Sequence, residues 1–138
     1  MLRVRKLHPS ACLPSYGTAG AAGVDFCCVE GAFITPNSAF RIRTGVSVEL
    51  PPGHFGYVTL RSGWGAMGLV ALGGIIDNDY RGEIIICGFN LSNLSIPISV
   101  GMRLGQMVCI PYVAPTIVQV EELPPTGRGD GGFGSTGR

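Results

Sequence analysis

The feature that most constrains the fold is a succession of short strand-like segments separated by glycine, proline and asparagine. In the clearest case, residues 40–50, polar side chains alternate with one apolar face made of Phe40, Ile42, Val46, Val48 and Leu50. Such alternation predicts a half-buried strand. The same reading predicts strands at residues 24–29, 55–60, 84–90, 107–112 and 116–120.

No segment shows a sustained 3.6-residue apolar period, and at most residues 63–69 would form one short helix. Short strands at roughly even spacing predict an all-β sandwich or barrel. A chain of 138 residues suits one domain. Its hydrophobic content of 46% argues against disorder.

Composition and charge indicate which kinds of partner and which cellular compartment to expect. No apolar run approaches the ~18 residues of a membrane span, and no signal peptide is recognisable, so we expect a soluble, intracellular protein without a membrane partner. The net charge of +1 gives no general reason to expect nucleic-acid binding. Nine of the ten basic residues are arginines, whose planar guanidinium matches phosphate, although codon bias produces the same skew.

Several kinds of site are excluded by counting residues. The number of cysteines, five, is odd, and the sequence contains no Cys-x-x-Cys motif, which argues against a disulfide framework or a zinc site. Most of them are expected to be reduced core residues. The only lysine, Lys6, is not part of a Gly-Lys-Ser/Thr phosphate loop. With only His8 and His54, a Ser–His–Asp triad has few ways to form.

The first candidate site lies in residues 73–86, Gly-Gly-Ile-Ile-Asp-Asn-Asp-Tyr-Arg-Gly-Glu-Ile-Ile-Ile. Asn78 and Asp79 are turn formers, and the flanking isoleucines favour strands. We therefore predict a strand–turn–strand hairpin that projects Asp77 and Tyr80 from its end. A carboxylate there could act as a base beside an aromatic ring. The alternative is an ordinary surface turn.

The second candidate is the glycine-rich C-terminus. The last fifteen residues contain six glycines and almost nothing to bury, which predicts a flexible tail. They also contain Arg128, a lone Phe133 and a Ser-Thr pair, a combination suited to clamping phosphate. The alternative is a disordered terminus. We accordingly divide the chain into a body, residues 1–123, and a tail, residues 124–138.

Five stretches together resemble one family. Residues 22–25, 61–63, 74–82, 101–106 and 128–137 are similar, in order, to the five motifs of the trimeric dUTP pyrophosphatases, or dUTPases. The resemblance implies a β jelly roll, a homotrimer with active sites shared between subunits, and Mg²⁺-dependent hydrolysis of dUTP to dUMP and pyrophosphate. Within it, Asp77 matches the residue that positions and deprotonates the attacking water. Tyr80 matches the ring beneath the deoxyribose that rejects a 2′-hydroxyl, and Asp25 matches the acid that reaches Mg²⁺ through water.

The resemblance assigns the remaining contacts by position. Phosphate contacts fall on Arg61, Ser62, Gly63 and Gln106. Uracil would be read by backbone groups of the hairpin, including Gly74 and Ile76. The tail would fold over the nucleotide with Arg128, Gly132, Ser135 and Thr136, while Phe133 stacks on uracil.

This chain departs from the family pattern at four positions: Trp64, Ala71, Met102 and Gly105. None removes a group that the chemistry needs. Three other readings stay open. A dCTP deaminase or its bifunctional relative shares the fold, a silent paralogue could act in signalling, and Arg128-Gly129-Asp130 spells an integrin-type tripeptide typical of a binding module.

Overall fold

The computed structural model describes residues 1–137, and Arg138, the last residue of the predicted tail, lies outside the described residues. The first strands are β1 (Arg3–Lys6), β2 (Ser15–Tyr16), β3 (Val24–Cys27), β4 (Ala32–Ile34), β5 (Ser38–Arg43), β6 (Val46–Glu49) and β7 (His54–Leu60). The helix α1 (Ser62–Ala66) follows, and then β8 (Leu69–Ala71), β9 (Ile75–Ile76), β10 (Ile85–Asn90), β11 (Ile96–Ile98) and β12 (Arg103–Pro111).

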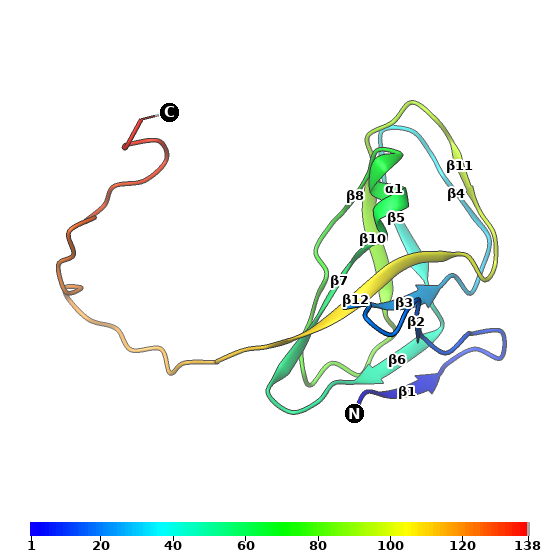
Figure 1. Ribbon diagram of the computed structural model, residues 1–138, viewed down its shortest axis with the longest axis horizontal. Coiled ribbons are helices and arrows are strands. Elements are labelled where there is room, and N and C mark those ends of the chain that lie inside the picture. Colours follow the sequence, from blue (N-terminus) through cyan, green and yellow to red (C-terminus); the bar gives the residue numbers. More distant parts are fainter. Residues whose placement is uncertain (138) are drawn as a thin grey trace.

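The strands form an antiparallel jelly-roll sandwich (Figure 1). A five-stranded sheet has the order β2-β3-β12-β7-β9, and a three-stranded sheet has the order β5-β10-β8. Two ribbons, β1-β6 and β11-β4, complete it. The prediction of an all-β fold with one short helix is confirmed. No helix in residues 1–137 is long and apolar enough to cross a membrane.

The core contains the apolar positions that alternate along these strands. The largest fully buried side chains are those of Phe26, Ile34, Leu69, Ile84, Ile86, Leu104 and Met107. They come from both large sheets and from the β4–β11 ribbon, so burial of their surface holds the layers together. Gly105, where the family commonly has alanine, faces this core. A Cβ there would lie 2.8 Å from Ile86 Cδ1 and 3.1 Å from the Thr59 carbonyl oxygen, so alanine at residue 105 would require the Ile86 side chain to shift.

The predicted continuous strand at residues 40–50 is wrong in one respect, because the chain forms two strands there. β5 pairs with β10, whereas β6 pairs with β1. Between them Gly45 has a φ of 69°, in the left-handed region that breaks a strand. Thr44 is buried, and its Oγ1 donates to the carbonyl oxygen of Ile84 at 2.6 Å. Because the break keeps the even-numbered side chains inward, the alternation was a correct guide to the buried apolar face but not to pairing. Ser47, expected on the polar face, is buried as well.

The predicted hairpin at residues 73–86 is also different. β9 pairs with β7 in the five-stranded sheet, and β10 pairs with β5 and β8 in the three-stranded sheet. The turn between them therefore passes from one sheet to the other. At its start Gly74 has a φ of 101° and its carbonyl accepts a hydrogen bond from Val58 N at 2.7 Å. A Cβ at residue 74 would collide with the Val58 carbonyl, so a glycine is required there.

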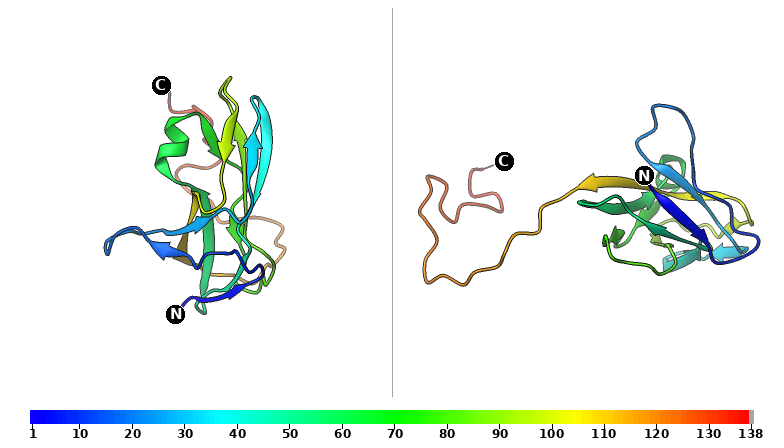
Figure 2. Two further views of the ribbon diagram at one scale, coloured as in Figure 1. Left: turned by 90° about the vertical axis from the view of Figure 1, so that its right-hand side faces the viewer. Right: turned by 90° about the horizontal axis from the view of Figure 1, so that it is seen from below.

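The predicted strand at residues 116–120 is wrong for the single chain. β12 ends at Pro111, and residues 112–137 form turns and extended backbone without helix or strand. Figures 1 and 2 show this segment leading away from the body. We call residues 112–123 the arm and residues 124–137 the tail. The arm contains many apolar side chains that are nevertheless exposed, and Ile117 has 95% of its surface exposed. The sequence of residues 116–120 favours a strand, but no neighbouring strand is available to pair with it here, so no strand forms.

Candidate active site

One small cavity brings together four of the residues singled out from the sequence. Asp25, Arg61, Ser62 and Gln106 line a cavity of about 190 Å³, which we call the Asp25 cavity. β3 and β12 position two of them, since Asp25 lies opposite Gln106 in the antiparallel register. The other two stand where β7 ends and α1 begins. Residues from three of the five motifs therefore meet here, although they are far apart in the sequence.

The Asp25 carboxylate is buried, with 7% of its side chain exposed, and two guanidinium groups balance its charge. Arg61 Nε lies 3.2 Å from Oδ1, and Arg103 Nη1 lies 3.6 Å from Oδ2. A buried carboxylate needs such partners, because desolvation of an unpaired charge is costly. Two arginines against one acid leave the cluster with one positive charge. Arg103 was not singled out from the sequence, although its place in the fourth motif could have identified it.

Gln106 is held in the same cavity by close packing. Its Nε2 lies 3.4 Å from the Leu60 carbonyl oxygen, a long contact. A Cβ at Gly23 would lie 2.5 Å from Gln106 Oε1, so glycine at residue 23 gives the amide its place. The side chain can therefore present one amide group to the cavity. A polar ligand such as a phosphate would find both a guanidinium and an amide donor within one small space.

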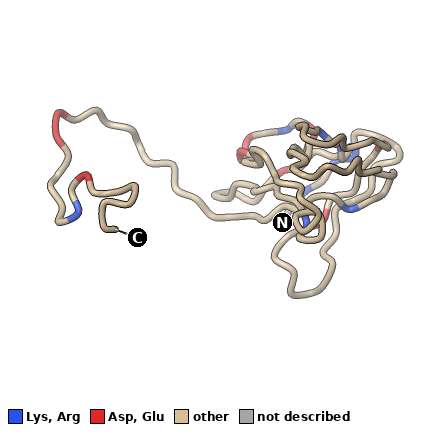
Figure 3. The backbone as a smooth tube through the Cα atoms, turned by 90° about the horizontal axis from the view of Figure 1, so that it is seen from above, with Lys and Arg blue, Asp and Glu red and all other residues tan. Residues whose placement is uncertain are grey.

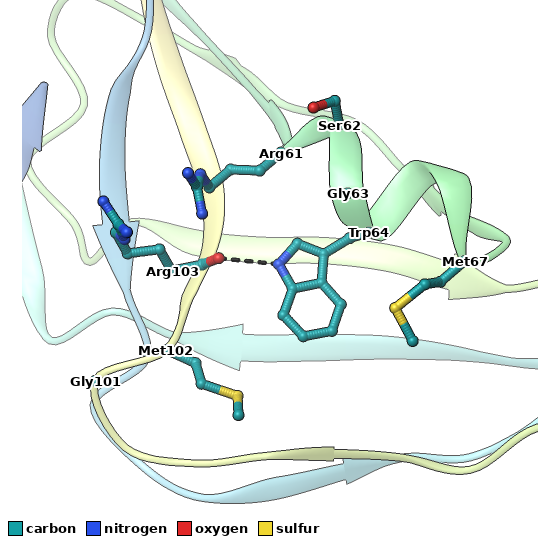
Figure 4. Close-up of a pocket in the computed structure, with 8 residues that line it drawn as sticks. All are labelled: Arg61, Ser62, Gly63, Trp64, Met67, Gly101, Met102 and Arg103. Carbon is teal, nitrogen blue, oxygen red and sulfur yellow. Dashed lines mark hydrogen bonds between the residues drawn. The ribbon is translucent and has the colours of Figure 1, made fainter. Parts of the chain in front are cut away.

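A larger groove of about 590 Å³ adjoins the Asp25 cavity and shares Arg61 and Ser62 with it. Figure 4 shows Trp64 of α1 reaching across to β12, where its indole Nε1 donates to the Arg103 carbonyl at 2.9 Å. The helix has only five residues and no side-chain cap, so this bond helps to fix the helix, whose first residue is Ser62. Trp64, one of the departures from the family pattern, has a structural role here, and Met102 lines the same groove.

Asp77 lies in a different cavity, of about 290 Å³, whose lining is Arg41, Ile75, Ile76, Asp77, Tyr80, Glu83 and Ile85. Within residues 1–137 the linings of this Asp77 cavity and of the Asp25 cavity have no member in common. On the other side of the turn, Asp77 also borders a cavity with Phe55, Asp79 and Tyr112. The Asp77 carboxylate is exposed and thus accessible to a ligand.

Hydrogen bonds hold the turn at residues 77–80 from both sides. Asn78 Nδ2 donates to the carbonyl oxygens of Pro51 and His54, at 2.8 Å each. Arg81 Nη1 donates to the carbonyls of Asn78 at 2.7 Å and Tyr80 at 3.0 Å. From the sequence Asn78 was named only as a turn former and Arg81 was given no role, because their partners are backbone groups that only the folded chain identifies. Together they fix the backbone that carries Asp77.

The tail lies apart from both cavities and makes local contacts. Arg128 Nε donates to the Gly131 carbonyl at 2.9 Å, and Ser135 N donates to the Gly132 carbonyl at 3.0 Å. Phe133 is fully exposed. Figure 3 shows the charges of this segment, red and blue, at a distance from those of the body. Thr136 and the rest of the predicted clamp are thus present, but the single chain does not bring them to either cavity.

The cysteines offer no ready nucleophile beside Asp25. Burial, followed by the neighbouring Cys12, raises the pKa of the Cys27 thiol. Burial raises the pKa of Cys28 to about 11. Both thiols are therefore protonated at neutral pH, and only a thiolate is a strong nucleophile or metal ligand. All five cysteines are free. The prediction that most of them belong to the core is wrong, because only Cys28 is buried, whereas three others are half-buried and Cys12 is exposed.

The protein therefore belongs to the class of antiparallel jelly rolls that carry a charged cavity, which here lies between β3, β12 and the start of α1. A family model described as dUTPase matches residues 10–137, and the chain belongs to the dUTPase family. The deoxyuridine 5'-triphosphate nucleotidohydrolase of Hydrogenobaculum sp. (strain Y04AAS1) is 43% identical over 140 residues, which cover 99% of this chain and 97% of the relative.

Solved structures agree with the sequence comparison. A mutant of the Staphylococcus bacteriophage 80alpha dUTPase with dUpNHpp superposes with a TM-score of 0.90 at 29% identity, covering 100% of this chain and 99% of that one. A mutant dUTPase from phage phi11 of S. aureus, described as coordinating a structural Mg(II) ion, has a TM-score of 0.83 at 28% identity. It covers 91% of this chain and 99% of that one.

Proposed function

We propose that the protein is a dUTP diphosphatase, which hydrolyses dUTP to dUMP and pyrophosphate. The observation that carries the proposal is the Asp25 cavity of a member of the dUTPase family, where Arg61, Ser62 and Gln106 line the space around one carboxylate. A second arginine pairs with the same carboxylate from the adjoining groove. Guanidinium, hydroxyl and amide groups are the donors that a triphosphate needs. The exposed Asp77 supplies the base.

In the proposed reaction, Asp77 accepts a proton from water while the water oxygen attacks the α-phosphorus in line. The bond from that phosphorus to the bridging oxygen breaks, and pyrophosphate leaves. A carboxylate does this only if it is held within hydrogen-bond reach of the water, so the fixing of the turn by Asn78 and Arg81 supports the role. Arg61, Ser62, Gly63 and Gln106 would hold the phosphates.

Magnesium fits the proposed site as an outer-sphere partner of Asp25. Each carboxylate oxygen retains a lone pair beyond its arginine contact, and the carboxylate lines a cavity of about 190 Å³. Magnesium usually keeps several waters and uses one or two carboxylates together with substrate phosphates. When bound, it would supply charge neutralisation for the phosphates. Asp25 would contact the waters of the ion, while Arg61 and Arg103 keep the carboxylate in place.

Base and sugar recognition are proposed for the Asp77 side of the site. Backbone groups near Gly74 and Ile76 can pair with uracil O4, N3–H and O2, whereas cytosine presents a donor where an acceptor is expected. The ring of Tyr80 would lie beneath the deoxyribose and exclude a 2′-hydroxyl. The tail would close over the nucleotide, with Phe133 on uracil and Arg128, Gly132, Ser135 and Thr136 at the phosphates.

We further propose that the protein is a homotrimer in which each active site is shared between subunits. The two cavities have separate linings, and the tail lies away from both, so one chain leaves each site incomplete. The arm adds a second reason. Its apolar side chains are exposed in the single chain, and surface of that kind is normally covered by a partner.

Sharing predicts complementation between two inactive variants. A chain with Asp77→Asn keeps its tail, and a chain that ends at Gly127 keeps Asp77. After subunit exchange, mixed trimers should regain a part of the wild-type rate, because some sites receive an intact Asp77 from one chain and an intact tail from another. Pyrophosphate release measures the recovery, and native mass spectrometry confirms mixed trimers. If proven mixed trimers stay inactive, the site lies within single chains.

The activity itself is tested by pyrophosphate release from dUTP, dTTP, dCTP and UTP with Mg²⁺. We expect kcat/KM for dUTP to exceed that for dCTP by at least about 10²-fold, since a site built on hydrogen bonds rejects mismatched groups strongly. For UTP and dTTP, which carry one added group, we expect steric exclusion worth up to about 10²-fold. EDTA should reduce the rate. Release of ammonia from dCTP would instead support the deaminase alternative. Absence of turnover with every nucleotide would favour a binding or signalling role.

A further inference from the structure

We infer that Gly82 is a specificity-determining positioning residue. Because glycine has no side chain, the ring of Tyr80 can pack directly against its backbone. The inference builds on the proposed function, in which this ring discriminates between deoxyribose and ribose. It concerns a residue that touches neither sugar nor phosphate. Gly82 would act only through Tyr80.

The ring of Tyr80 lies directly over Gly82. The three heavy atoms nearest to a Cβ built at residue 82 all belong to Tyr80. Its Cε2 would be 2.8 Å away, and its Cζ and Oη would be closer still. The backbone of Gly82 lies outside the left-handed region, so the conformation itself does not require glycine. What requires glycine is the space taken by the ring.

A hydrogen bond holds the hydroxyl end of the ring, which is the end that lies against Gly82. Tyr80 Oη donates to the Glu83 carbonyl oxygen at 3.0 Å. The Glu83 side chain is anchored in turn, since its carboxylate accepts from Gly45 N at 2.7 Å and from Arg43 Nε at 3.1 Å. The ring thus rests on Gly82 and is tied by its hydroxyl to a fixed carbonyl, although 42% of Tyr80 is exposed. Tyr80 also lines the Asp77 cavity.

The position of the Tyr80 ring decides which sugar the site can exclude. A ribonucleotide differs from a deoxyribonucleotide by a single oxygen, so a ring displaced by about 1 Å no longer meets the sugar in the same way. Any side chain at residue 82 would push the ring from its place and stretch the bond to Glu83. The loss should fall on discrimination rather than on the phosphate contacts, which lie in the other cavity.

The test is Gly82→Ala, assayed by pyrophosphate release from dUTP and from UTP. We expect the ratio of kcat/KM for dUTP to that for UTP to fall by about tenfold or more, as steric selection against one hydroxyl is worth up to about 10²-fold. Gly20→Ala is the matched control, because a Cβ at residue 20 meets nothing within 4 Å and its backbone also lies outside the left-handed region. It should leave the ratio unchanged.

A double-mutant cycle with Tyr80→Ala shows whether the effect passes through the ring. In the Tyr80→Ala background, Gly82→Ala should change neither the ratio nor the thermal midpoint, because the clashing atoms are gone. This also covers the case in which Gly82→Ala alone folds poorly. An effect that persists without the ring, or an equal loss for both nucleotides, overturns the inference. A wild-type protein inactive on dUTP overturns the proposed function, whereas normal turnover with an unchanged ratio in Gly82→Ala overturns only the role of Gly82.

Discussion

Replacing Asp77 by asparagine is expected to lower kcat for dUTP by about 10²–10⁴-fold, with a modest change in substrate binding. Asparagine keeps the shape of the side chain and its place in the turn, but it cannot accept the proton from water. The turn should persist, since its anchors are Asn78 and Arg81 rather than the Asp77 carboxylate. Steady-state pyrophosphate release gives kcat, and equilibrium titration with a non-hydrolysable dUTP analogue gives affinity.

Asp79→Asn provides the matched control for this prediction. The same chemical change is made two residues away, at an exposed acid that borders the cavity with Phe55 and Tyr112 rather than the Asp77 cavity. It should leave kcat within about twofold, as expected for a surface acid outside the reaction. If Asp77→Asn retains most of the wild-type kcat, or if Asp79→Asn is equally damaging, Asp77 is not the base.

Truncation after Gly127 is expected to lower kcat/KM by about 10²-fold or more while leaving the fold and the oligomeric state unchanged. The tail contributes local hydrogen bonds and no core side chain in the described residues, so the body does not depend on it. Its groups are matched to a nucleotide, and closure would bring the charge of Arg128 onto the phosphates and exclude other water. Thermal unfolding and size-exclusion chromatography check that only activity is lost.

The tail should order only when ligand is present. Fixing the backbone costs roughly 1–2 kcal/mol per residue, and the glycines increase this cost, so phosphate and uracil must supply the compensating contacts. Phe133→Trp reports on the closure, because stacking on uracil should quench the new indole when a non-hydrolysable dUTP analogue binds. The unmodified protein, which contains only Trp64, supplies the signal to subtract. Unchanged turnover after truncation would mean that residues 128–136 are no clamp.

The sequence alone determined the class of fold, and it supplied the reactive groups that we propose. Alternation in residues 40–50 identified the buried face correctly, because the two faces of a strand are set by the backbone itself. The five motifs named Asp25, Asp77 and Tyr80 before any contact was known, since each motif is a short run of residues. Turn chemistry likewise located the turn at residues 77–80.

Only the tertiary structure decided which residues meet. It divided residues 40–50 between two strand partners, placed β9 and β10 in different sheets, and left the β-prone arm without a strand partner. It also paired Asp25 with Arg61 and Arg103, and seated the Tyr80 ring on Gly82. The physical reason is that propensity acts over a few neighbouring residues, whereas pairing, burial of charge and steric fit depend on groups that only the packed chain brings together.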